Sequence, residues 1–299
     1  MQRSKEQEFF TGNAFDYGAP IGFCIAMKYP QGILGIVSYN ENIYEEGFRP
    51  LTRRMNMEKH FFVASCVFTE GEPELSRKVQ TYVKERFSLP IIRCCVEKYK
   101  VQEFEERMPE WYRDEWKTIA HFAKYSAGST MVFICHNCSA IFEERHPEIS
   151  RQSVWELILE DDRFPYPDYH GERMAVQDCW RSKENRAEQD AVRELMKRMN
   201  INIVELTENH ERTKFCGYSL YQKQPPRNPK LAPKRFLEGA KGLFQEHTEE
   251  EKRQLMEDYC ATIPAEKVVA YCHYCIRGLH LGGKQGIHLA RLLFEQEKV

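Results

Sequence analysis

The sequence predicts an α/β protein in which a cysteine-rich unit with a mainly parallel sheet occurs twice, with metal sites at the carboxyl ends of the strands. Three observations predict it: short apolar runs that end on cysteine, amphipathic helical patterns that follow them, and the same order of cysteines in both halves. A strand, a helix and another strand in succession are typical of a parallel sheet. Residues at the ends of such strands converge at one edge, where α/β proteins usually bind ligands.

Four short apolar runs each lead to a cysteine. They span residues 60–66, 131–135, 174–179 and 268–272, and a fifth apolar run, without cysteine, spans 201–206. Their short length and their β-branched content are typical of buried parallel strands. We therefore expect the first four runs to deliver cysteines to the carboxyl edges of the sheets.

Helical patterns follow two of these strands. Thr69 to Pro73 reads as a helix start, and Leu75, Val79, Val83 and Phe87 then recur at a spacing of four residues. A similar apolar stripe covers 186–199. We interpret both stripes as the faces that pack against the core.

The pattern divides the chain into three segments. Residues 1–57 form an N-terminal extension with a predicted hairpin, residues 58–165 form the first cysteine-rich domain, and residues 166–299 form a second, degenerate one. The boundary lies near the turn-rich segment 164–168. An insertion at 218–250 interrupts the second domain and reads as an extended loop followed by a helix.

Composition excludes several classes of function. The 43 basic and 45 acidic residues nearly cancel, so the net charge of −2 predicts neither a nucleic-acid partner nor attraction to an anionic membrane. No apolar run reaches the roughly 20 residues of a membrane span, and the first residues lack a signal-like apolar core. We therefore predict a cytoplasmic location. In that reducing compartment, eleven cysteines indicate metal or redox chemistry rather than disulfides.

The order of the cysteines is the same in both halves. Each half has a cysteine after a strand, then a middle cysteine position, then C-x-x-C. In the first half these are Cys66, Cys94 with Cys95, and Cys135 with Cys138; in the second they are Cys179, Cys216, and Cys272 with Cys275. Thiolates suit iron–sulfur clusters and zinc, and five thiolates exceed what one zinc ion or one cubane uses. Cys24 and Cys260 fall outside this order, and we expect them to be small buried side chains.

This ordered set resembles the cysteine-rich CCG domain of the heterodisulfide reductase family and of related glycolate-oxidase and lactate-utilisation iron–sulfur proteins. In that family the cysteine-rich chain carries two such domains in tandem, each with the order C, CC, C-x-x-C. The resemblance runs from about Lys59 to Leu293 and includes the segments 135–142 and 214–217. It implies a noncubane four-iron cluster, bound by all five cysteines of a complete motif, that mediates disulfide reduction with electrons from a partner.

The resemblance assigns ligands by position. In the first domain they would be Cys66, Cys94, Cys95, Cys135 and Cys138, and in the second Cys179, Cys216, Cys272 and Cys275. Phe215 stands where the family has the first cysteine of its pair, so the second site has four thiolates. The family's glycine is present as Gly217, but Val96 replaces it in the first domain. The second site is therefore expected to hold an iron–sulfur cluster or zinc, with an empty site as the remaining alternative.

Several polar residues accompany the cysteines. His136 and His273 lie inside the C-x-x-C turns, where we expect residues that face solvent or donate to a cluster sulfur, with direct ligation as the alternative. Arg181, Lys183 and Arg186 follow Cys179. We expect them on a solvated helix face, and charge balance for a cluster or attraction of an anionic thiol is the alternative. The segment with Trp111, Arg113 and Trp116 is expected to form a helix that covers the first site.

The resemblance implies an iron–sulfur oxidoreductase subunit in which electron transfer is coupled to the reduction of a small thiol or disulfide substrate. The chain has no G-x-G-x-x-G that opens a helix after a strand, so a flavoprotein or ferredoxin-like subunit would have to supply the electrons. Two alternatives stay open. One is a non-enzymatic electron-transfer subunit of a larger complex, and the other is a zinc-stabilised structural module. No catalytic residue is predicted.

Overall fold

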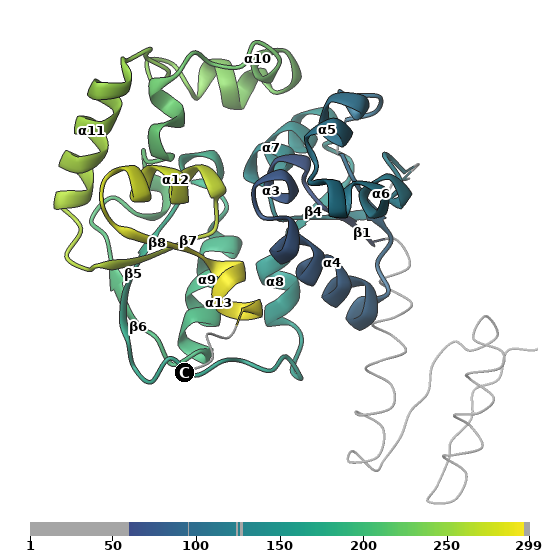
Figure 1. The fold of residues 1–299 in the computed structure, drawn as a ribbon, viewed down its shortest axis with the longest axis horizontal. Coiled ribbons are helices and arrows are strands. Elements are labelled where there is room, and N and C mark those ends of the chain that lie inside the picture. The colour runs from purple at the N-terminus through teal and green to yellow at the C-terminus, as the bar shows by residue number, and fades with distance from the viewer. Residues whose placement is uncertain (1–59, 95, 124, 126–127, 296–299) are drawn as a thin grey trace, which may run out of the picture. The chain divides into compact units, whose positions relative to one another are not determined.

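The computed structural model describes residues 60–94, 96–123, 125 and 128–295 (Figure 1). These residues fall in the second of the two units into which the chain divides, Lys59–Val299. The predicted N-terminal extension with its hairpin, Cys24 and Cys95 lie outside the described residues. Among the helices that are described, none is long and apolar enough to cross a membrane.

The described residues form two four-stranded, all-parallel sheets, which confirms the predicted α/β class. The first sheet has the order β2-β1-β3-β4, and the second has the order β6-β5-β7-β8. Their bounds are β1 His60–Val63, β2 Ile91–Ile92, β3 Thr130–Phe133, β4 Ser150–Ser153, β5 Arg173–Gln177, β6 Asn202–Glu205, β7 Lys267–Ala270 and β8 Gln285–His288. Counted along the chain, both sheets place their strands in the order 2-1-3-4, so the two halves repeat one topology.

The central strands of each sheet end at the same level. Val63 at the end of β1 is in register with Phe133 at the end of β3. In the second sheet Gln177 at the end of β5 is in register with Ala270 at the end of β7. The segments that follow these strands therefore start at one edge of each sheet, which is the edge where the cysteines stand.

Short helices connect the strands of the first half. They are α3 Cys66–Gly71, α4 Pro73–Phe87, α5 Val101–Arg107, α6 Glu110–Thr118, α7 His136–Arg145 and α8 Val154–Leu159. Pro73 stands in the first turn of α4, where its missing N–H costs no hydrogen bond. This helix buries Leu75, Val79, Val83 and Phe87, so the predicted apolar stripe is confirmed. Ser153 and Glu156 form a capping box that starts α8.

The second half contains more short helical turns. They are η2 Trp180–Ser182, α9 Arg186–Arg198, η3 His210–Arg212, η4 Gly217–Tyr221, α10 Asn228–Leu231, η5 Lys234–Glu238, α11 Glu249–Ala261, α12 His273–Leu281 and α13 Leu289–Phe294. Helix α9 buries Val192, Leu195 and Met196, as the stripe over 186–199 predicted. A capping box between Thr248 and Glu251 starts α11.

The insertion crosses from the second half onto the first. Residues 222–247, which we call the strap, contain α10 and the single π-helical turn η5. Asn228 donates to the Oδ1 atom of Asn137 at 3.4 Å, and the backbone N–H groups of Lys234 and Arg235 donate to the carboxylate of Glu144 at 2.9 and 2.7 Å. Both Asn137 and Glu144 belong to α7, so the strap is fixed to the helix that follows the first C-x-x-C (Figure 1).

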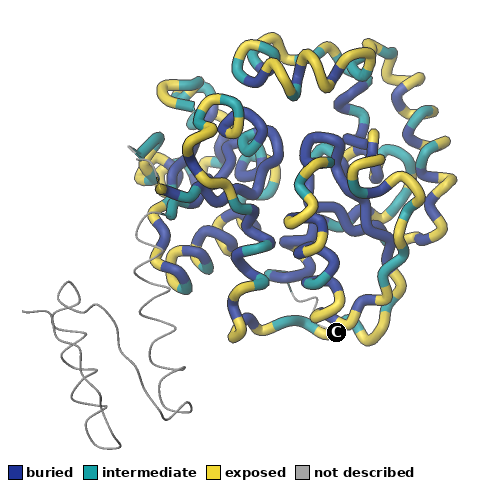
Figure 2. The backbone as a smooth tube through the Cα atoms, turned by 180° about the vertical axis from the view of Figure 1, so that it is seen from behind, coloured by how far each residue is buried: buried dark blue, intermediate teal, exposed yellow. Residues whose placement is uncertain are grey.

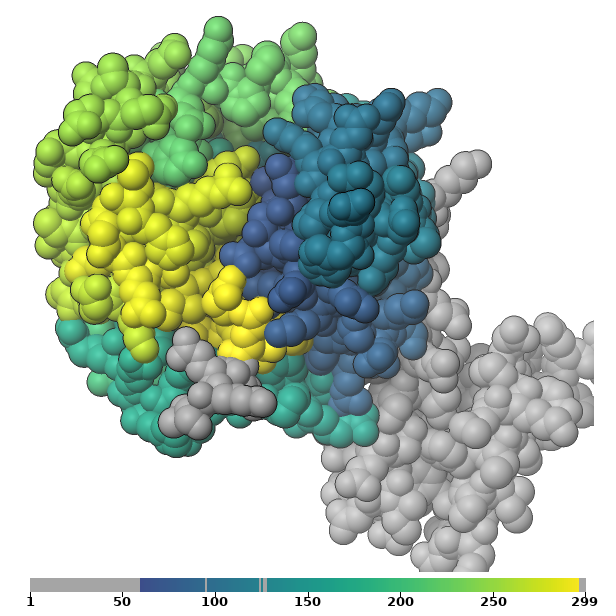
Figure 3. All heavy atoms as spheres, viewed as in Figure 1, coloured from purple at the N-terminus to yellow at the C-terminus, as the bar shows by residue number. Residues whose placement is uncertain are grey.

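The two halves also contact each other near the last helix. The rings of Phe68 and His288 lie 5.0 Å apart, and Arg291 donates to Glu72 at 2.6 Å. Figure 3 shows the last described residues, in yellow, directly against the first helices, in dark blue. Buried backbone concentrates in the strands and in the loops that follow them (Figure 2). All the described cysteines except Cys138 are buried.

A buried carboxylate joins α4 to the segment after α8. Asp161 is 1% exposed, accepts two hydrogen bonds of 2.6 Å from Arg86 and accepts a third, of 3.0 Å, from Tyr82. Burial alone would raise the pKa of Asp161, but the hydrogen bonds from Arg86 and its positive charge hold that pKa below its usual value. The ionised carboxylate is therefore the form that the fold stabilises.

We expect Asp161→Asn to lower the free energy of unfolding by about 2–3 kcal/mol at pH 7, because it leaves a charged arginine without its counter-ion. The pKa of Asp161 is lower in the folded than in the unfolded state, so this stabilisation is complete above the unfolded pKa of about 4 and is lost as the pH falls through the folded pKa. Urea unfolding at pH 7 and at about pH 3 measures both effects. Asp162→Asn is the matched control because Asp162 is exposed. An equal loss of the free energy of unfolding in both variants would contradict the stabilising role assigned to Asp161.

Candidate metal centre

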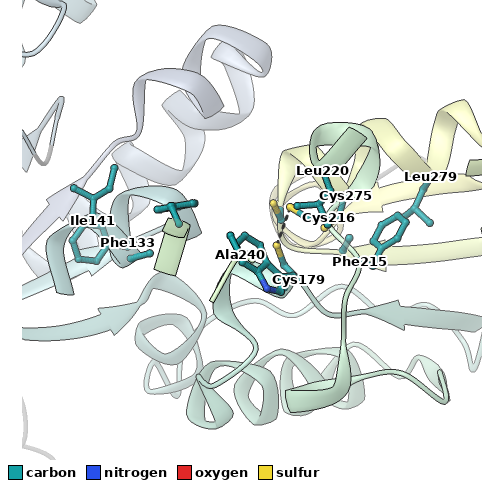
Figure 4. Close-up of a cluster of buried hydrophobic side chains, with 14 of the residues drawn as sticks. Phe133, Ile141, Cys179, Phe215, Cys216, Leu220, Ala240, Cys275 and Leu279 are labelled. Carbon is teal, nitrogen blue, oxygen red and sulfur yellow. Dashed lines mark hydrogen bonds between the residues drawn. The ribbon is translucent and has the colours of Figure 1, made fainter. Parts of the chain in front are cut away.

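Four cysteines of the second half converge on one point. The Sγ atoms of Cys179, Cys216, Cys272 and Cys275 all lie within 4.8 Å of one another, and all four residues are buried. The Sγ atoms of Cys179 and Cys216 are 3.4 Å apart. In Figure 4 the sulfur atoms of Cys179, Cys216 and Cys275 face one another. The structure thus brings together all four cysteines expected at the second site, and this buried group could hold a metal ion.

Strand ends and a helix start place three of these thiols. Cys179 and Cys272 each follow, by two residues, the end of one of the paired strands β5 and β7. Cys272 is the N-cap residue of α12, and Cys275 lies in the first turn of that helix. The helical turn folds Cys275 back over Cys272, which is why a C-x-x-C segment at a helix start can present two thiols to one centre.

The fourth thiol depends on a close contact between two glycines. Gly217 follows Cys216 and has a φ of +56°, and a Cβ atom built on it would lie 2.0 Å from the carbonyl oxygen of Tyr274. A Cβ atom on Gly278 would lie 2.3 Å from the Cα atom of Gly217. The backbone of η4 therefore packs directly on the backbone of α12, and this approach brings Cys216 to the C-x-x-C turn.

Phe215, which precedes Cys216, packs in the core beside the second site. Its ring stacks on Tyr259, with centroids 4.3 Å apart and planes 16° apart. Its carbonyl oxygen accepts the backbone N–H of Trp180 at 2.8 Å. The side chain is therefore part of the core beside the second site, which is consistent with a site of four thiols.

A buried aspartate ties the two cysteine-bearing strand ends together. Asp178, fully buried, accepts two hydrogen bonds from Arg193 at 3.1 and 2.9 Å and one from the hydroxyl of Tyr271 at 2.7 Å. Asp178 immediately precedes Cys179, and Tyr271 immediately precedes Cys272. Sequence reasoning missed this residue. The available signal was a carboxylate at the end of an otherwise apolar run, since a buried charge requires a partner.

Arg181 is buried against the thiols. It is 5% exposed, donates to the Sγ atom of Cys216 and lies with its guanidinium carbon 5.0 Å from the centroid of the Tyr274 ring. The expected solvated helix face is thus wrong for Arg181, because the 3₁₀ turn η2 directs it inward. Arg186 is exposed, as expected for a solvated helix face, and Lys183 is half-buried. A positive charge beside grouped thiols favours their thiolate forms.

The four thiols fall into two groups, one with a lowered pKa and one with a raised pKa. Hydrogen bonds from the other three thiols lower the pKa of Cys272 well below its usual value. Burial would raise the pKa of Cys216, but Cys179 and Arg181 lower it. Burial raises the pKa of Cys179 and Cys275. The thiolate form is therefore favoured more at Cys272 and Cys216 than at Cys179 and Cys275, and a bound metal would displace any remaining protons.

Three residues close to these cysteines in the sequence have a buried nitrogen without a hydrogen-bond partner in the described structure. The nitrogens are Trp180 Nε1, Arg181 Nε and His273 Nε2. Trp180 follows Cys179 in the chain, and His273 follows Cys272. Buried donors without an acceptor are rare in folded proteins. A bound group with acceptor atoms of its own could supply partners to such nitrogens.

The first set of cysteines also gathers at its sheet edge. Burial, and after it the neighbouring Cys135, raises the pKa of Cys66 to about 12, and a hydrogen bond with Cys138 raises the pKa of Cys135. Cys94 and Cys66 line a cavity of about 10 Å³. Among the described residues, only the second set forms a group of three or more such side chains placed so that it could hold a metal ion. Cys95, the fifth predicted ligand, lies outside the described residues.

The small cavity beside Cys66 and Cys94 is covered as the sequence predicts. Trp116 of α6 is buried and lines it, whereas Trp111 on the same helix is 54% exposed. Arg93 and His121 also line this cavity, and in the described structure Arg93 Nε and His121 Nε2 are buried without a hydrogen-bond partner. At the first site, residues with an unpartnered buried nitrogen and two of the cysteines thus line one cavity.

His136 joins the two cysteine sets. It belongs to the first C-x-x-C, but its Nε2 atom lies 3.3 Å from the carboxylate of Glu188 and 3.4 Å from the hydroxyl of Ser182, both in the second half. Burial disfavours its charged form, yet Glu188 and the thiol of Cys272 raise its pKa well above the usual value. The expectation of a solvent-facing residue is wrong for His136, because the second half covers it. In the second C-x-x-C, burial lowers the pKa of His273 to about 4.

Comparisons with known proteins do not identify a family for this chain. No family model matches the chain, and no solved structure matches it significantly. A segment of 40 residues is 55% identical to a protein of Saccharomyces cerevisiae named as an uncharacterized hydrolase. The match covers 13% of this chain, and the chain spans only 14% of the length of that relative. The segment is similar to part of a hydrolase, and the likeness does not extend to the rest of the chain.

Proposed function

We propose that this chain is an iron–sulfur redox protein, similar to the CCG-domain chain of heterodisulfide reductase, in which electron transfer is coupled to thiol–disulfide reduction. The observation that carries the proposal is the repeated placement of cysteines at the carboxyl edges of two sheets of the same topology. Two sites at equivalent edges are what a tandem of cluster-binding domains requires. The unpartnered buried nitrogens of residues near both sets support a bound group with acceptor atoms, such as the sulfides of a cluster.

In this proposal Cys66, Cys94, Cys95, Cys135 and Cys138 would hold a noncubane four-iron cluster, and Cys179, Cys216, Cys272 and Cys275 would hold the second group. An iron–sulfur cluster, when bound, takes up and releases electrons. Arg181 would offset the negative charge of the second group, since its guanidinium already contacts Cys216. Electrons would come from a flavoprotein or ferredoxin-like subunit, and a small thiol or disulfide would be the substrate.

A second candidate is that the four-thiol site holds structural zinc. Tetrahedral zinc with Zn–S bonds of about 2.3 Å places its sulfurs about 3.8 Å apart. The four sulfurs here lie within 4.8 Å of one another, which is close to that spacing. The thiolates of a cubane bind four different irons and stand farther apart. The compactness of the second site thus favours one ion, whereas the unpartnered nitrogens of neighbouring residues favour a group with acceptor atoms.

Metal analysis of anaerobically purified protein tests both candidates. We expect about four or more irons per chain with matching acid-labile sulfide and a broad visible absorption. About four irons with one zinc would assign the cluster to the first site and zinc to the second. Colourless protein with stoichiometric zinc and no acid-labile sulfide would contradict the redox proposal. Electron paramagnetic resonance of the oxidised protein, with and without an added thiol, then tests substrate contact, and an unchanged signal would count against it.

A further inference from the structure

Two adjacent residues of the strap, Arg227 and Asn228, reach the first cysteine set. Asn228 is 2% exposed, and its Nδ2 atom donates to the Oδ1 atom of Asn137 at 3.4 Å. Asn137 is itself buried and lies between Cys135 and Cys138 in the first C-x-x-C. The strap is therefore bonded to the turn that carries two of the predicted ligands.

Arg227 contacts a different part of the same set. Its guanidinium carbon lies 4.3 Å from the centroid of the Tyr99 ring, which is within the range of a cation–π contact. Tyr99 lines the cavity of about 10 Å³ together with Cys66 and Cys94. The arginine thus lies on the aromatic ring that borders two further predicted ligands.

The two contacts are joined inside the strap. The Nε atom of Arg227 donates to the Oδ1 atom of Asn228 at 3.2 Å, while the Nδ2 atom of Asn228 donates to Asn137. A continuous series of polar contacts therefore runs from the ring of Tyr99 to the first C-x-x-C. It connects two segments of the first half that are distant in the sequence, and it does so through residues of the second half.

The charge of Arg227 also acts on this set. Burial, and after it the neighbouring Cys135, raises the pKa of Cys66 to about 12, and the positive charge of Arg227 opposes this increase. A positive charge near grouped thiols favours the thiolate form, which is the form that binds metal.

Other charged groups near this site have partners of their own. Arg93, which lines the same cavity, pairs with Glu105. The hydrogen bond from Lys100 lowers the pKa of Glu103 more than the charge of Arg227 does. These pairs leave the charge of Arg227 able to act on the thiols.

We propose that Arg227 is a positioning residue of the first metal site, supplied by the second half of the chain. Through Asn228 and Tyr99 it holds the C-x-x-C turn and the segment after Cys94 in one arrangement, and its charge offsets that of the bound thiolates. It has for the first site the role that Arg181 has for the second. The inference rests on the proposed function only in that the first set binds a metal group, and it does not depend on which group that is.

The rate of metal release into a chelator, measured on the full, anaerobically purified chain, tests this role. Arg227→Gln removes the charge and the contact with Tyr99, and we expect the first site to release its metal at least about tenfold faster. Asn228→Ala breaks the link to Asn137 and is expected to act in the same direction. Arg227→Lys keeps the charge and can still lie on the ring, so we expect it to restore most of the retention, which a purely steric role would not predict.

Lys223→Gln is the matched control, because Lys223 is an exposed basic residue of the same strap. Its metal release should match that of the wild type. Cys216→Ala then assigns the loss to a site. The metal losses of Arg227→Gln and Cys216→Ala are expected to add in the double variant, because they come from different sites.

Three results would overturn the proposal. They are release from Arg227→Gln that is no faster than release from Lys223→Gln, no rescue by Arg227→Lys, and a double variant that loses no more metal than Cys216→Ala alone. If Arg227→Gln does not fold, as judged by its thermal unfolding, then Asn228→Ala decides in the same comparisons.

Iron, zinc and acid-labile sulfide in the wild type test the proposed function separately. Zinc without iron would contradict the redox function, and the release rates would still decide the role of Arg227. Iron with sulfide, together with unchanged release from Arg227→Gln, would support the redox function and contradict this role. A first site without any metal would contradict both.

Discussion

Replacing Gly217 by alanine is expected to lower the free energy of unfolding by more than about 3 kcal/mol and to remove the metal of the second site. A methyl group at this position would lie 2.0 Å from the carbonyl oxygen of Tyr274, which is backbone and cannot swing away. The new side chain would also sit on a residue with a φ of +56°. Either η4 or α12 must move, and Cys216 directly precedes η4 whereas Cys275 lies in α12.

Gly242→Ala separates the effect of the steric clash from the effect of the positive φ. Gly242 has a φ of +78°, but no atom lies within 4 Å of the position of its Cβ. This variant therefore carries only the conformational cost, which is about 1–2 kcal/mol. Denaturant unfolding and metal content, measured on both variants, check the prediction. If the two variants lose the same stability and both keep their metal, then the close approach of η4 to α12 does not hold the site together.

Cys216→Ala is expected to weaken metal binding at the second site by more than about 100-fold and to leave the first site loaded. Its thiol is one of four that converge, and among the described residues this group contains no fifth cysteine. Because metal binding and folding are coupled at such sites, the unfolding temperature should fall with the metal content. Metal stoichiometry after dialysis against a chelator, together with thermal unfolding, measures both.

The matched control is Cys260→Ala. Cys260 is also buried, at 1% exposed, but it lies on α11 and its Sγ atom approaches the carbonyl oxygen of Leu279 at 3.8 Å rather than another thiol. This variant removes a buried thiol of the same size without removing a ligand, so its metal content should match that of the wild type. Equal metal loss in both variants would mean that general loosening of the core, not ligation, releases the metal.

Local patterns were enough to predict the sheet edges. The strand before Cys179 and the strand before Cys272 are apolar, short and followed by polar residues, and strand pairing then brings both cysteines together. The same reasoning predicted the stripe on α4 and the packed role of Cys260. These features depend on residues that are close in the sequence, so periodicity and spacing reveal them.

Contacts between distant segments could not be predicted in this way. His136 is buried because Glu188 and Ser182, from the other half, cover it. The sequence predicts a solvated helix face for Arg181, but a 3₁₀ turn directs its side chain to Cys216. A single sequence does not show which distant segments contact each other. The burial of these charged groups therefore becomes visible only in the tertiary structure.

The strap has a mechanical consequence. The halves are joined covalently by the connection between α8 and β5, and the strap adds a second tether where the backbone of Lys234 and Arg235 is anchored to Glu144. Two attachment points restrict the relative motion of two bodies much more than one does. For the halves to swing apart, the strap must first detach from α7. Detachment would also withdraw Arg235 from the cavity that it lines together with His136 and Arg181, so we expect this cavity to lose one wall when the halves separate.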